Sequence, residues 1–116
     1  MSEKNKNILR QANEAVEGGD YEGFLLHCTE ETTWEFVGDQ TLRGKEAVRQ
    51  YMKSVYIEPP VLTVEHMISE GDSLTALGEI RIKDESGNVE HSAYCDVWRI
   101  KDGKLDQLKA YVVEVK

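Results

Sequence analysis

The chain has 116 residues, of which 31% are charged and 40% hydrophobic, and its formal net charge is −8. This length predicts one domain with its own core, spanning residues 1–116. The composition excludes a disordered or membrane-spanning chain, because no apolar run approaches the roughly 18 residues that a span requires. An acidic surface repels phosphate groups, so we expect neither a nucleic-acid partner nor a membrane partner.

The N-terminal sequence M-S-E-K-N-K-N is polar and lacks the apolar segment of a secretory signal. The two cysteines, Cys28 and Cys95, are far apart in the sequence and form no C-x-x-C pair. That pattern favours buried, reduced thiols over a disulfide. We therefore expect a cytoplasmic protein.

The N-terminal half is predicted to be mainly helical. An apolar stripe at helical spacing predicts a first helix over Ser2–Glu17, and Gly18-Gly19 ends it by permitting a left-handed cap. Asp20 can cap a short second helix. A brief strand at Trp34–Val37 and a loop lead to a third helix over Lys45–Val55.

The C-terminal half is predicted to be a run of antiparallel strands. Asp102-Gly103 suits the type I′ turn of a hairpin, because both residues tolerate positive φ. Helices followed by strands indicate an α+β fold with the helices on one face of the sheet. Strands of about ten residues must coil strongly, which leaves a cone with an open mouth for a ligand. The four expected strands cover Val61–Glu70, Leu74–Lys83, Val89–Ile100 and Leu105–Val115.

The strand before the turn contains the unusual chemistry of this chain. Its alternation puts Tyr94, Asp96 and Trp98 on one face and Cys95 and Val97 on the other. If the first face is concave, the carboxyl group of Asp96 lies among aromatic rings, where burial raises its pKa and suits it to acid–base work or hydrogen-bond donation. The alternative is a structural carboxylate bonded to a tyrosine or a helix end.

Four stretches carry a likeness to a known family: Gly18-Gly19-Asp20, T-T-W-E-F, Leu42–Val48 and Asp96–Leu105. Together they resemble the nuclear transport factor 2-like superfamily, in its SnoaL-like and ketosteroid-isomerase-like branch, and the resemblance covers nearly the whole chain. It implies a cone-shaped barrel in which a strongly curved, mostly antiparallel sheet wraps round three N-terminal helices. It also implies a pocket on the concave face and a homodimer formed through the outer face of the sheet, where Ala93, Cys95 and Val97 would lie.

The resemblance does not extend to every catalytic position of the characterised branches. Asp96 matches the oxyanion-hole aspartate of ketosteroid isomerases, but Phe36 stands where their base should lie and Ala12 falls near their helix-one tyrosine. The Arg-x-Asp pair of limonene epoxide hydrolases is replaced by Tyr94-Cys95-Asp96. Both activities are therefore disfavoured, whereas the polyketide-cyclase type, with one acid–base carboxylate in an apolar pocket, remains open.

The other candidate site residues each have a functional and a structural interpretation. Trp34, Phe36 and Trp98 can form apolar pocket walls or a filled core, and Tyr51 can close one side of the pocket or pack in the core. Tyr94 can orient Asp96, donate a hydrogen bond to a ligand, or simply pack. Glu79 and Arg81 share one strand face with Leu77, which makes them a second acid and its partner if that face is concave and surface charges otherwise. We favour the surface position.

No metal, nucleotide or catalytic-triad motif occurs, so we expect neither a metal nor a cofactor. Two functions remain. The first is binding of a small apolar or ring-containing molecule, with cofactor-free isomerase, cyclase or lyase chemistry from Asp96. The second is a non-catalytic ligand-binding or dimer-scaffold protein with a partly filled pocket.

Overall fold

The computed structural model describes residues 2–115. It contains three helices, α1 (Ser2–Glu17), α2 (Tyr21–Leu25) and α3 (Lys45–Val55). The six strands are β1 (Cys28–Phe36), β2 (Gln40–Arg43), β3 (Val61–Glu70), β4 (Ser73–Lys83), β5 (Val89–Lys101) and β6 (Lys104–Glu114). No helix in the described part of the chain is both long and apolar enough to cross a membrane.

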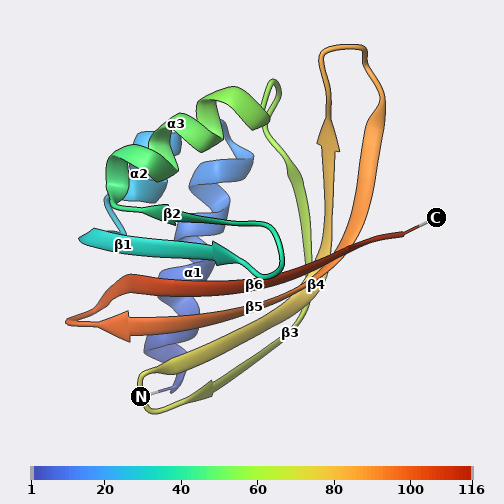
Figure 1. Cartoon of the computed structure of the whole chain (residues 1–116). Coiled ribbons are helices and arrows are strands. Elements are labelled where there is room, and N and C mark those ends of the chain that lie inside the picture. Colours follow the sequence, from blue (N-terminus) through green and yellow to red (C-terminus); the bar gives the residue numbers. More distant parts are fainter. Residues whose placement is uncertain (1, 116) are drawn as a thin grey trace.

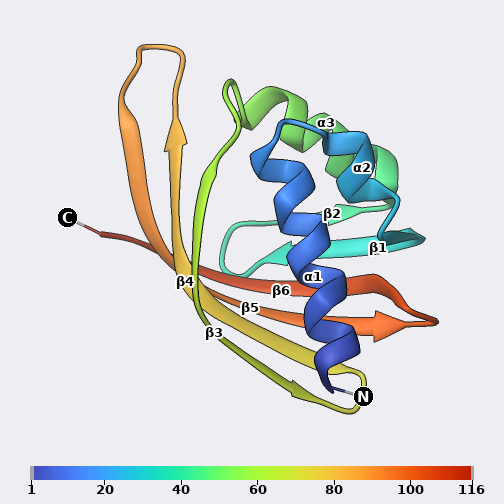
Figure 2. The same ribbon diagram turned by 180° about the vertical axis from the view of Figure 1, so that it is seen from behind.

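The strands form one curved, unclosed sheet in the order β2-β1-β6-β5-β4-β3. All neighbours pair antiparallel except β1 and β6, which pair in parallel. Figure 1 and the reverse view in Figure 2 show the three helices on the concave side of the sheet, with the other face uncovered. The predicted α+β fold, a strongly curved sheet with three N-terminal helices, is confirmed.

The turns and caps have the geometry that their residues favour. The Asp20 carboxylate accepts a hydrogen bond of 2.9 Å from the backbone N–H of Gly23 and so caps α2. In the β5–β6 turn, Asp102 has φ 52° and Gly103 has φ 76°, the two positive angles that a type I′ turn needs. This turn, together with the register shift between Arg99 and Ile100, sets the pairing of β5 with β6.

The structure corrects two parts of the sequence prediction. β1 begins at Cys28 and not at Trp34, and Gln40–Arg43 forms the strand β2 where a loop was expected. Both segments are rich in polar residues, which hid their strand character. β1 is nevertheless inserted between β2 and β6, and the hydroxyl group of Thr32 is buried and donates to the carbonyl oxygen of Leu105 at 3.3 Å.

The hydrophobic core lies between α1, α2, α3 and the concave face. One face of α1 is buried against the sheet through Leu9, Ala12 and Val16, as its apolar stripe predicted. From the sheet, Leu74 and Leu105 are fully buried. Leu9 and Val16 also border the cavity described below, so α1 belongs both to the core and to the cavity wall.

Gly78 permits a close approach between β3 and β4. A Cβ atom at this position would lie 2.1 Å from the carbonyl oxygen of Thr63 and 3.0 Å from the hydroxyl oxygen of Tyr94. The pairing of β3 with β4 also shifts register between Val64 and His66, which marks a bulge beside this contact. The absence of a side chain at Gly78 therefore allows the sheet to bend here.

We predict that Gly78→Ala destabilises the protein by about 1–3 kcal/mol, because the added methyl group overlaps backbone that cannot move freely. Urea unfolding followed by circular dichroism measures the change in the free energy of unfolding. Gly18→Ala is the matched control, because its Cβ would lie at an ordinary 3.4 Å from the nearest atom. Equal stability of the two variants would contradict the role assigned to Gly78.

Candidate functional site

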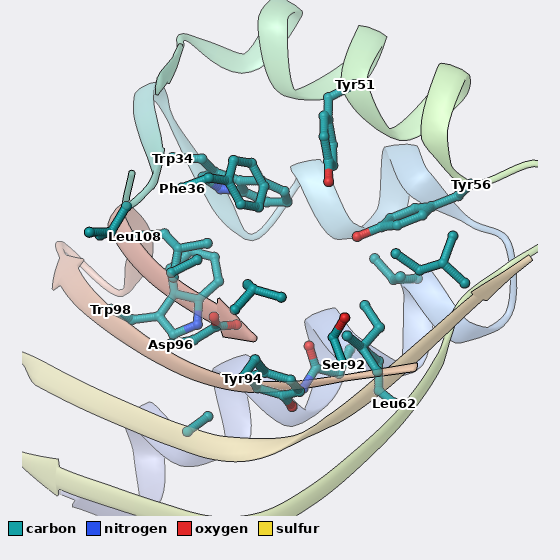
Figure 3. Close-up of a pocket in the computed structure, with 18 of the residues that line it drawn as sticks. Trp34, Phe36, Tyr51, Tyr56, Leu62, Ser92, Tyr94, Asp96, Trp98 and Leu108 are labelled. Atoms are coloured by element: carbon teal, nitrogen blue, oxygen red, sulfur yellow. The ribbon is translucent and has the colours of Figure 1, made fainter. Parts of the chain in front are cut away.

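A cavity of about 370 Å³ lies between the concave face of the sheet and the helices. Its wall includes residues of α1 and α3 and of strands β1, β3, β4, β5 and β6. Figure 3 shows aromatic side chains from α3 and β1 above the cavity and the carboxyl group of Asp96 on the sheet below it. The volume is within the range of pockets that bind small molecules.

Asp96 lies on the cavity floor because its two neighbours across the sheet are small. It pairs with Ala76 on β4 and with Ala110 on β6, and both alanines also line the cavity. The carboxyl group is surrounded by protein except where it borders the cavity, so the residue is half-buried. Burial raises the pKa of Asp96 to about 7.

The carboxyl group of Asp96 has no hydrogen-bond partner among residues 2–115. A structural carboxylate would accept hydrogen bonds from a tyrosine or a helix end, and each such bond to the charged form would lower its pKa. Tyr51 and Tyr94, the two tyrosines considered in the sequence analysis, donate no bond to it in the structure. The hydrogen bonds that a structural carboxylate would accept are therefore not found within residues 2–115, and desolvation is the cause of the raised pKa.

Trp34, Phe36 and Trp98 form one side of the cavity wall. The Trp34 ring centroid lies 6.1 Å from that of Trp98 and 6.2 Å from that of Phe36, in edge-to-face arrangements. Both indole N–H groups are buried, and neither has a hydrogen-bond partner within residues 2–115. The three rings are thus part of the core and of the cavity wall at once.

Tyr51 and Tyr56 continue this aromatic wall, and the Tyr51 ring centroid lies 5.1 Å from that of Phe36. Their hydroxyl groups project into it from α3 and from the segment after α3 (Figure 3). Burial raises the pKa of Tyr51 to about 12, with smaller contributions from the charges of Asp39 and Glu90, and burial also raises the pKa of Tyr56. Both hydroxyl groups therefore keep their protons at neutral pH and can donate hydrogen bonds to a ligand.

The sequence analysis did not identify Tyr56. It directly follows α3 and its place was obscured by the Glu58-Pro59-Pro60 signal that ends the helix. The sequence signal that could have identified Tyr56 is its spacing. It comes five residues after Tyr51, so one ring lies on α3 and the other lies directly after its C-terminal end. Their ring centroids are 6.0 Å apart in the structure.

Tyr94 lies beside Asp96 on the floor of the cavity, two residues earlier on the same face of β5. Its hydroxyl oxygen is located over Gly78, 3.0 Å from the place that a Cβ atom there would occupy. Burial raises the pKa of Tyr94, and the nearby charge of Asp96 adds to the effect. The two residues are electrostatic neighbours without a hydrogen bond between them.

Glu79 and Arg81 lie on the outer face of the sheet and line no part of the cavity. The alternate residues of β4, among them Ala76 and Ile80, face inward instead. The carboxylate of Glu79 makes a hydrogen-bond contact with the imidazole of His91 on the neighbouring strand. Glu79 and Arg81 are therefore surface residues, and Glu79 is not a second acid beside Asp96.

No cluster of three or more potential metal ligands occurs in the described part of the chain. The cavity itself presents one carboxyl group whose raised pKa lies near neutral pH, and tyrosine hydroxyl groups that stay protonated. Such a set can remove a proton from a bound molecule and donate hydrogen bonds to an oxygen atom where negative charge develops.

Solved structures of nuclear transport factor 2-like proteins share this fold at low sequence identity. A protein of unknown function from Burkholderia pseudomallei is 20% identical with a TM-score of 0.83, over 97% of this chain and 92% of that one. SalBIII, described as an epoxide hydrolase/cyclase-like enzyme in pyran ring formation in salinomycin, is 21% identical with a TM-score of 0.86, over 96% and 92%. A ketosteroid isomerase assigned by similarity, from Kribbella flavida, is 16% identical with a TM-score of 0.83, over 99% and 82%.

Among curated proteins, no significant match was found. The family model of the SnoaL-like domain, in contrast, matches residues 9–107, which include α3, the aromatic wall and the whole of β5. With this match and the shared fold, the chain belongs to the SnoaL-like domain family of the nuclear transport factor 2-like superfamily.

Proposed function

We propose that the protein binds a small apolar or ring-containing molecule in the cavity and that Asp96 performs cofactor-free acid–base chemistry on it, of the isomerase, cyclase or lyase type. The observation that carries the proposal is a carboxyl group without a hydrogen-bond partner, with a pKa of about 7, on the floor of an apolar cavity. A pKa near the working pH is the best compromise for a group that must both accept and return a proton.

The arrangement favours proton transfer at a carbon atom next to a carbonyl group. Ionised Asp96 would remove the proton from below, and the Tyr51 and Tyr56 hydroxyl groups would donate hydrogen bonds to the carbonyl oxygen from above (Figure 3). Asp96 would then return the proton to another atom of the same molecule. Tyr94, the neighbour of Asp96, is included in the proposal as a third hydrogen-bond donor, located at the floor of the cavity.

A second candidate function is non-catalytic ligand binding or a dimer scaffold. It is favoured by the two positions where related isomerases carry a base and a tyrosine. Phe36 lines the cavity without a titratable group, and Ala12 is fully buried in the core. In this alternative the ligand would be bound by the aromatic wall, and Asp96 would only hold a proton.

We also propose a homodimer formed through the outer face of the sheet. No helix covers this face (Figure 1), and its apolar residues remain partly exposed. Val97 is 36% exposed, Tyr111 44% and Val113 68%.

The two free thiols, Cys28 and Cys95, support the expectation of a cytoplasmic protein.

The base activity of Asp96 can be measured without knowing the natural substrate. We predict that the protein accelerates exchange of the protons next to the carbonyl group of trans-1-decalone with D2O, at a rate that rises with pH and levels off above about 7. Asp96→Asn should reduce the protein-dependent rate by about 10²–10⁴-fold, the usual contribution of a general base. Proton NMR of the ketone follows the exchange.

The control for this experiment is Asp72→Asn, which removes an exposed carboxylate from the β3–β4 turn. Tyr94→Phe removes the hydroxyl group at the floor of the cavity and so tests its role as a hydrogen-bond donor. Quenching of tryptophan fluorescence reports ketone binding, because both tryptophans of the chain line the cavity. Binding without accelerated exchange would exclude the catalytic proposal and favour the second candidate function.

Stability should depend on pH through Asp96. Because its pKa is raised in the folded state, folding keeps a proton that the unfolded chain releases, so the stability present below about pH 4 is lost as pH rises to about 7. We predict that the free energy of unfolding of Asp96→Asn, minus that of the wild type, increases between pH 4 and pH 8 by something on the order of 2–4 kcal/mol. Urea unfolding at both pH values measures it, and a constant difference would refute the raised pKa.

The dimer proposal predicts that Val97→Asp shifts the protein toward a monomer, because the variant buries a charge in the proposed interface. Size-exclusion chromatography with light scattering gives the mass in solution. Ile57→Asp is the control, because Ile57 is 50% exposed on the helix side of the molecule. A monomeric wild type, or a Val97→Asp variant that remains dimeric, would contradict the proposal.

A further inference from the structure

Every formally charged side chain that lines the cavity is acidic. Asp39 comes from the turn between β1 and β2, and Glu90 and Glu114 come from β5 and β6. Asp96 lies deeper, on the floor. Among the described lining residues there is no lysine, arginine or histidine.

The three outer carboxylates belong to the solvent-exposed part of the cavity lining. All three side chains are exposed, whereas the floor and the aromatic wall are largely buried. Glu114 pairs with Ser92 across β5 and β6, and Glu90 is two residues before Ser92, so both lie at the same end of the concave face. Asp39 and Glu90 each act electrostatically on Tyr51, which connects them to the aromatic wall.

None of these three carboxylates has a cationic partner within residues 2–115. The ion pairs of the protein join other acidic residues, for example Glu58 with Lys83 at 3.2 Å and Glu22 with Arg49 at 2.7 Å. Unneutralised negative charge at the open side attracts a cation and repels an anion, and the formal net charge of −8 adds to both effects.

The wall behind the carboxylates also suits a cation. The rings of Phe36 and Tyr51 have centroids 5.1 Å apart, and the Tyr56 ring follows at 6.0 Å from Tyr51. Aromatic faces attract ammonium groups, and carboxylates beside such rings add a direct charge interaction. The apolar floor next to this wall requires that the rest of the ligand be hydrophobic.

From these features we infer that the ligand is an amine: a hydrophobic, ring-containing body that fills the cavity, with an ammonium group between the aromatic wall and Asp39, Glu90 and Glu114. The inference rests on the proposed function, since it names the class of molecule that occupies the same cavity. It excludes carboxylic acids and phosphate esters as ligands of this site.

Three probes with the same ring and chain test the inference: 4-phenylbutylamine, 4-phenylbutan-1-ol and 4-phenylbutanoate. Tryptophan fluorescence of Trp34 and Trp98 measures the dissociation constants. We expect the amine to bind about tenfold more tightly than the alcohol at low ionic strength, and the carboxylate most weakly. Added salt should reduce the advantage of the amine, because the outer carboxylates are exposed.

A matched pair of triple variants separates local charge from total charge. Asp39→Asn, Glu90→Gln and Glu114→Gln together remove the outer carboxylates, and Glu31→Gln, Glu70→Gln and Glu85→Gln remove three exposed carboxylates that line no part of the cavity. Each set changes the formal net charge from −8 to −5. The first set should abolish the preference for the amine without weakening binding of the alcohol, and the second should preserve the preference.

Equal binding of amine and alcohol, or tightest binding of the carboxylate, would overturn the inference while leaving the cavity as a small-molecule site. Loss of the preference in both triple variants would also overturn it, because total charge and not the outer carboxylates would then be responsible. Failure of all three probes to bind would reject the proposed function itself, and the inference with it.

Discussion

The carboxyl group of Asp96, held without a hydrogen-bond partner on an apolar sheet face, is the constraint on which the rest of the site depends. Burial removes water from this group and disfavours its charged form. The protein tolerates the burial because the raised pKa, about 7, lets the carboxyl group keep its proton below that pH. Ala76 and Ala110 on either side leave open volume above the carboxyl group. Larger side chains there would fill the cavity and remove the access that gives the group a chemical role.

The cavity is produced by the way in which the long strands cover the helices. The α1 helix crosses the concave face and contributes Leu9 and Val16 to the cavity wall, while α3 and the residue after it contribute Tyr51 and Tyr56 (Figures 1 and 3). Gly78 and the bulge in β3 let the sheet bend on the side of the cavity opposite α3 and β1. The site is therefore a consequence of curvature, because the bent sheet and the helices enclose the volume between them.

Much of this could be predicted from short-range patterns. Alternation along β5 predicted which residues share a face with Asp96, and helical periodicity predicted the bounds of α1 and α3. Polar composition concealed β2 and the first part of β1, whose strand character comes from pairing with distant segments. The open volume also could not be predicted, because it depends on Ala76 and Ala110, which are far apart in sequence and meet Asp96 only through the register of three strands.

The charge of the ligand affects the pKa of Asp96, because the ligand and the Asp96 carboxyl group would lie in the same cavity. A bound ammonium group would stabilise the ionised form of Asp96 and lower its pKa, so the carboxylate would act as a base at neutral pH. A neutral ligand that displaced water without bringing charge would raise the pKa further, so Asp96 would act as a base only at higher pH. An anionic ligand would have the same effect while also being repelled by Asp39, Glu90 and Glu114. Of the three classes, the cation is therefore the one that the outer carboxylates attract and that also keeps Asp96 in its ionised, proton-accepting form.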